Sequence, residues 1–185
     1  MKKKGLALLL ALTLVVVGVA SGTLAWLTAQ SGPVVNTFTT SGIEVKLEET
    51  TGSEYKMVPG FEIAKNPKAT VVANSEECYL FVKLEKSAGF DTYLEYTVDS
   101  GWTALEGVDG VYYRKVTTDD MGTAYDVLAG NKVTVKSSVT KTDMDALNAE
   151  GAVKPTLTVT AYASQLYKSA GSEFTPTEAW TNVGA

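Results

Sequence analysis

The feature that most constrains the fold is an alternation of apolar and polar residues with a period of two, repeated in short segments. Ile43, Val45 and Leu47 alternate with charged residues, and the segments 78–84 and 157–163 show the same pattern. Such alternation is typical of antiparallel strands with one buried face. We therefore expect the apolar residues of these segments to face a common core.

Further strands are predicted at 94–98, 111–116 and 133–135, again from apolar residues at alternate positions. The segments are separated by turn-forming residues at the spacing expected of a β-sandwich. The turn signals are Pro59-Gly60, Asn74-Ser75, Asp99-Ser100-Gly101, Asp109-Gly110 and Gly130-Asn131. No regular alternation of strands with long helices is present, so the pattern predicts an all-β antiparallel sandwich rather than a parallel sheet.

Capping signals predict two short helices. Thr142, three residues before Asp145, predicts a helix over 143–150 that ends at Gly151. A second signature near the C-terminus has a capping threonine, a proline at the first helical position and a glutamate at the third. Its residues are Thr175, Pro176 and Glu178. We expect a single helical turn there.

The N-terminus has the organisation of a secretory signal. Three lysines, Lys2 to Lys4, precede an apolar stretch over 6–20, and small residues follow. We expect residues 1–25 to be removed, with Thr23, Ala25 and Trp26 at the cleavage site. The alternative is a retained membrane anchor, because residues 5–27 are about as long as the ~20 residues that span a bilayer.

Composition excludes several classes of function. The chain has no histidine, and Cys78 is its only cysteine. This excludes a Ser-His-Asp triad, a Cys-His pair, histidine-based zinc chemistry and an intramolecular disulfide. With 16 basic and 21 acidic residues, and a basic run only at the N-terminus, the chain has no nucleic-acid footprint. We expect no catalytic residues and no cofactor.

Three further candidate sites have simpler interpretations. Cys78 lies among apolar alternate positions, which favours a buried small hydrophobe over a reactive thiol. Turn formation is a simpler explanation of the loop aspartates than Ca²⁺ binding, since none of them has EF-hand spacing. Strand and core packing explains Trp102 and Tyr112-Tyr113 as well as a binding surface does. The loop aspartates are Asp99, Asp109, Asp119, Asp120 and Asp126.

Three stretches resemble the TasA/camelysin family, whose members are exported through the signal peptidase SipW in Gram-positive bacteria. They are Gly22-Thr23-Leu24-Ala25-Trp26-Leu27 with Val35-Asn36-Thr37-Phe38-Thr39 and Gly42-Ile43-Glu44-Val45; Cys78-Tyr79-Leu80-Phe81-Val82-Lys83-Leu84; and 157–165 before Ala179-Trp180. The first is similar to the family's cleavage zone and entry strand, and the others to its later strands. The family pattern usually has alanine where this chain has Cys78.

The resemblance implies a secreted, jelly-roll-like sandwich over 42–185 that assembles into fibres of an extracellular biofilm matrix. Residues 26–41 would then be donated as a strand to a neighbouring copy, with Val34, Val35 and Phe38 as anchors. Alternatively, this segment is a first strand on its own domain. Other partners would be matrix or cell-surface proteins, and contact with the membrane would occur only through the signal before cleavage.

Two other functions remain as alternatives at this stage. One is a monomeric secreted or surface sandwich that binds a host or cell-wall ligand. The other is a secreted metallopeptidase, since camelysin is classified as one, but a chain without histidine lacks the usual zinc ligands. Paired acids such as Glu48-Glu49 would point to opposite faces of a strand.

Overall fold

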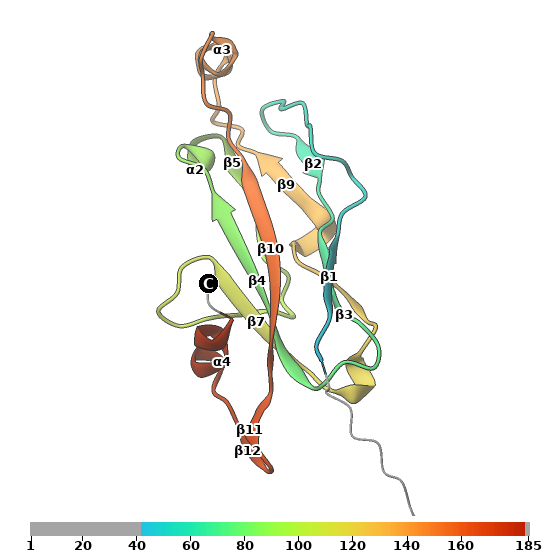
Figure 1. Cartoon of the computed structure of the whole chain (residues 1–185). Helices are drawn as coiled ribbons and strands as arrows, with labels where there is room; N and C mark the ends of the chain where they lie inside the picture. The colour runs from blue at the N-terminus through green and yellow to red at the C-terminus, as the bar shows by residue number, and fades with distance from the viewer. Residues whose placement is uncertain (1–41, 184–185) are drawn as a thin grey trace, which may run out of the picture. The chain divides into compact units, whose positions relative to one another are not determined.

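The computed structural model describes residues 42–183, which belong to one compact unit of the chain. Their main layer is a four-stranded antiparallel sheet (Figure 1). In spatial order its strands are β10 (Leu157–Gln165), β4 (Cys78–Lys86), β7 (Val111–Val116) and β6 (Thr103–Ala104). The long β4 and β10 are paired along their whole lengths, from Leu157 opposite Lys86 to Gln165 opposite Cys78.

The opposing layer consists of two three-stranded antiparallel sheets placed end to end (Figure 1). One has the order β1 (Val45–Glu48), β3 (Lys68–Val71), β8 (Ala124–Asp126), and the other β2 (Glu62–Ala64), β9 (Lys132–Val135), β5 (Leu94–Glu95). The chain passes from β2 directly into β3, and from β8 by a short turn into β9. The protein is therefore an antiparallel β-sandwich, as the alternation predicted.

The core between the layers is formed by alternate residues of strands from both sides. Leu80 and Val82 of β4 and Val71 of β3 are completely buried, as are Ala69 and Val135. Burial of apolar surface contributes about 25 cal/mol per Å². This core is therefore the main source of the sandwich's stability.

A second, smaller core lies on the other face of β4. Tyr79 and Phe81 pack there with Leu166 and with Trp180 of the helix α4 (Pro176–Asn182). The hairpin β11 (Tyr167–Ser169) and β12 (Ser172–Glu173) leads into this helix. Because α4 covers the face that carries Tyr79 and Phe81, β4 is buried on both sides for most of its length.

Most strand predictions are confirmed, including 111–116, which coincides with β7. The strand predicted over 94–98 exists but is shorter than predicted, because β5 contains only Leu94 and Glu95. Tyr96 packs on the core, and Val98 forms an isolated bridge with Leu128. β3 was not predicted, since its run after Pro67 is only four residues long.

One helix begins at a different residue from the one predicted. Helix α3 (Lys141–Asn148) begins after Thr140, whose hydroxyl accepts a hydrogen bond from the Asp143 N–H, and it ends before Gly151. Thr142 is therefore not the cap, and Asp145 instead pairs with Lys141 at 2.6 Å.

The capping signature of α4 is confirmed, although the helix is longer than one turn, at seven residues, because Ala179 and Trp180 are buried. A one-turn helix, α2 (Phe90–Tyr93), and two 3₁₀ turns, η1 (Thr118–Asp120) and η2 (Ala129–Asn131), were not predicted.

Candidate functional site

The most distinctive surface of the domain is the sandwich edge where β1 and β10 lie beside each other (Figure 1). The two strands belong to opposite layers, and each is the outermost strand of its sheet. Within residues 42–183, β1 pairs only with β3, and β10 only with β4. Each strand therefore presents one row of backbone N–H and C=O groups outside these ladders, as edge strands do.

A row of apolar side chains follows this edge, and each is only half-buried. We call it the β1/β10 edge: Ile43, Val45, Leu47, Leu157, Val159, Ala161 and Ala163. On the neighbouring strand β4, by contrast, Leu80 and Val82 are completely buried. Among the described residues, the core is thus less completely covered along this side of the sandwich.

The opposite side of the sandwich is closed by aromatic side chains around Arg114. The guanidinium carbon of Arg114 in β7 lies 3.4 Å from the ring centroid of Tyr125 in β8 and 5.5 Å from that of Trp102. The indole N–H of Trp102 donates to the Asp126 carbonyl at 2.8 Å. Asp126 also pairs with Lys68 at 2.9 Å. Cation–π stacking and a hydrogen bond therefore join the two layers here.

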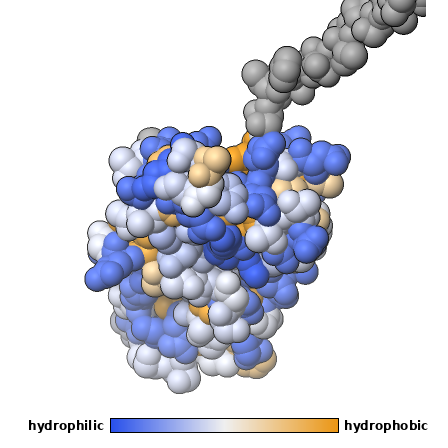
Figure 2. Space-filling model, turned by 90° about the horizontal axis from the view of Figure 1, so that it is seen from below, coloured by the Kyte–Doolittle hydropathy of each residue, from blue (hydrophilic) through white to orange (hydrophobic). Residues whose placement is uncertain are grey.

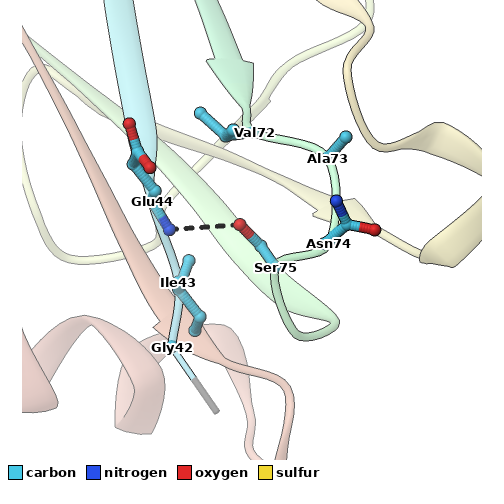
Figure 3. A pocket seen from close by; sticks show the side chains of 7 residues that line it. All are labelled: Gly42, Ile43, Glu44, Val72, Ala73, Asn74 and Ser75. Atoms are coloured by element: carbon cyan, nitrogen blue, oxygen red, sulfur yellow. Dashed lines mark hydrogen bonds between the residues drawn. The ribbon is translucent and has the colours of Figure 1, made fainter.

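At one end of β1, the first described residues and the β3–β4 turn enclose an open hollow of about 260 Å³ (Figure 3). It is lined by Gly42, Ile43, Glu44, Val72, Ala73, Asn74 and Ser75. The Ser75 hydroxyl accepts a hydrogen bond from the Glu44 N–H at 3.1 Å. The Glu76 N–H donates to the Gly42 carbonyl at 3.2 Å. Hydrogen bonds to the β3–β4 turn thus hold the chain from the first described residue into β1.

The residues predicted for cleavage and strand donation lie outside the described part of the chain. They are Thr23, Ala25 and Trp26 at the cleavage site and Val34, Val35 and Phe38 in the donor segment. The proposed boundaries after residues 25 and 41 lie there as well. What the structure describes is the surface that such a segment would meet.

Cys78 is a free, completely buried residue of the main core. Burial raises the pKa of its thiol to about 11. The neighbouring Glu77 carboxylate instead accepts the backbone N–H of Thr118, which lowers its own pKa. The prediction of a buried small hydrophobe is confirmed.

The aspartates considered for Ca²⁺ have local structural roles. Asp99 accepts the Gly101 N–H at 3.0 Å, Asp120 accepts the Thr117 hydroxyl at 2.8 Å, and Asp126 pairs with Lys68. Asp119 lies in η1 and Asp109 in a separate turn. Over residues 42–183, no group of three or more acidic or cysteine side chains is arranged to hold a metal ion.

The aromatic residues considered for ligand binding do not share a surface. Trp102 and Tyr112 pack on the main core, whereas Tyr113 packs on the second core. The acidic pair is also separated, because Glu48 ends β1 while Glu49 receives hydrogen bonds from Lys65. Arg114 was not among the residues that the sequence analysis selected. The one feature of the sequence that sets it apart is that it is the chain's single arginine.

Comparison with protein-family models, curated proteins and solved structures finds no match to this chain. In the part of the chain that the structure describes, no helix is long and apolar enough to cross a membrane.

Proposed function

We propose that this chain is a secreted structural protein that self-associates into fibres of an extracellular matrix by strand donation. Residues 26–41 of one copy pair with the β1/β10 edge of the next copy. The observation that supports this most strongly is the row of half-buried apolar side chains along an edge where, within residues 42–183, both strands lack an outer partner. We propose no catalytic activity and no cofactor.

An added strand would stabilise this edge in two ways. Its backbone would pair with the free N–H and C=O groups of an edge strand, and its alternate side chains would cover this side of the core. Val34, Val35 and Phe38 supply apolar side chains for this. The opposite sandwich edge offers less, because Trp102 and Arg114 with Tyr125 already close it.

The proposed export route fits the same mechanism. Before cleavage by a SipW-type peptidase the donor segment would remain tethered to the signal in the membrane, and after cleavage it would be free to join another copy. We propose a Gram-positive cell surface or matrix as the location, with self-association and contacts to other matrix or surface proteins. Export and assembly would thereby be coupled.

The test compares a chain that begins at Trp26 with one that begins at Gly42. The main core and the second core both consist of described residues, so both chains retain them. Size-exclusion chromatography and negative-stain microscopy then measure assembly across concentration and pH. We expect filaments from the longer chain and compact monomers from the shorter one.

A matched pair of variants locates the acceptor. Val159→Lys places a charge on the β1/β10 edge, and Val153→Lys places the same charge at an exposed position outside it. We expect only Val159→Lys to prevent filaments. Compact monomers of the longer chain under all conditions would refute self-assembly and favour the ligand-binding alternative.

A further inference from the structure

The hollow beside Gly42 and the turn at Phe61 lie at opposite ends of the same layer (Figure 1). From Phe61 the chain runs through β2 and β3 to Val72, which lines the hollow. At about 3.3 Å per residue this run of eleven residue steps spans at most roughly 36 Å. The domain therefore has two distinct ends, each with its own surface chemistry.

The turn at 58–61 presents two exposed apolar side chains on a well-anchored backbone. Val58 is 48% exposed and Phe61 66%. The Phe61 N–H donates to the Val58 carbonyl at 3.0 Å, and the Phe61 carbonyl accepts the Val135 N–H of β9 at 2.9 Å. The Gly60 N–H also donates to Val135. An exposed aromatic held in place by a sheet is a feature of contact surfaces.

The hollow at the other end combines apolar walls with acidic side chains. Ile43 and Val72 give it apolar walls, and the exposed Glu44 and Glu76 lie at its border. Figure 2, which views this end, shows hydrophobic surface near the start of the described chain, surrounded by hydrophilic side chains. Lys56 is exposed beside the turn at 58–61. Within residues 42–183 none of these three charged side chains takes part in an ion pair.

We propose a head-to-tail contact in which Val58 and Phe61 of one copy pack into the hollow between Ile43 and Val72 of the next copy, with Lys56 facing Glu44 and Glu76. This rests on the proposed function, because the donor segment joins the domain at Gly42. We therefore place the copy that receives the segment at this end. Contact between two different surfaces repeats without closing and gives a filament, whereas contact of like ends gives a closed dimer.

The experiment measures the critical concentration for filament formation of chains that begin at Trp26. Phe61→Ser removes the aromatic side chain from the turn, and Val153→Ser removes another exposed apolar side chain outside it. We expect Phe61→Ser to raise the critical concentration about tenfold or more, as the loss of a buried phenylalanine would. Val153→Ser should leave it unchanged. Both positions are exposed, so thermal unfolding should be unaltered and serves as the folding control.

Charge exchange tests the orientation of the contact. We expect Lys56→Glu to weaken assembly, and Glu76→Lys in the same chain to restore it at low salt. Equal critical concentrations for wild type and Phe61→Ser would overturn the head-to-tail contact and leave strand donation standing. Phe61-dependent assembly of the chain that begins at Gly42 would support the contact and refute strand donation. Monomeric wild type throughout would refute both.

Discussion

Phe81 of β4 and Trp180 of α4 lie with their ring centroids 5.2 Å apart and their planes at 55°. Tyr162 of β10 completes the group, edge-on to Trp180 at 5.3 Å. Such tilted arrangements contribute beyond the area that they bury. The C-terminal helix is therefore an integral cover of the sheet that carries the proposed acceptor strand.

Replacement of Trp180 by alanine should strongly destabilise the domain. Trp180 is 7% exposed, and truncation of a buried tryptophan costs about 3–5 kcal/mol. Urea unfolding followed by circular dichroism measures this cost. Thr177→Ala, at an exposed position of the same helix, is the control and should cost little. Equal unfolding midpoints for the two variants would show that α4 adds no stability.

The attachment of α4 should weaken in acid. The backbone N–H of Thr175 donates to the Glu178 carboxylate, and Lys168 pairs with it at 3.1 Å, so the pKa of Glu178 lies below its ordinary value of 4.5. A lowered pKa stabilises the fold above about pH 4.5, and this contribution is lost as the pH falls through the folded value. The protection of the α4 amides against exchange, corrected for the intrinsic pH dependence of the exchange rate, should therefore fall in acid. Glu178→Gln should abolish this pH dependence, and an unchanged profile would exclude this carboxylate as its cause.

Replacement of Arg114 by lysine should destabilise the closed sandwich edge. A lysine keeps the charge but loses the planar group that stacks on Tyr125, at a cost of about 1 kcal/mol. The free energy of urea unfolding measures this. Lys115→Arg is the control, because it changes the adjacent residue and preserves an ion pair with Glu173. If Arg114→Lys unfolds like wild type, the charge alone accounts for the interaction.

Cys78 should be unreactive in the folded protein. Its thiol is buried and has a pKa of about 11, so almost no thiolate forms at pH 8. Iodoacetamide should modify the thiol only after denaturation. Cys78→Ser should destabilise the fold more than Cys78→Ala, because an unpaired buried hydroxyl costs about 1–3 kcal/mol. Rapid modification under native conditions would contradict this placement.

The strand positions could be predicted because alternation is a local property of the chain. Val45 and Leu47 face the core as expected, and so does Cys78. The start of α4 could also be predicted, since the hydrogen bonds of a capping box join residues only three apart, here Thr175 and Glu178. Short strands such as β3 carry too little periodicity to be recognised.

Only part of the candidate site could be predicted from the sequence, namely which side chains face the core. Leu157 and Val159 were expected to face a core, and they do, but their strand is an outer one and leaves them half-buried. Alternation reports which face of a strand is apolar and carries no information on its neighbours. Whether a strand is central or at an edge depends on pairing between distant segments.

Local patterns of residues along the chain were thus enough to predict the β-sandwich class, the apolar face of each long strand, the cap of α4 and the buried state of Cys78. Three relationships could be found only in the folded domain: β1 and β10 meet at an edge of the sandwich, α4 covers Phe81, and Arg114 stacks on Tyr125. The physical reason is that these relationships arise from packing between segments far apart in the chain, where the free energy depends on how all of the strands pair at once.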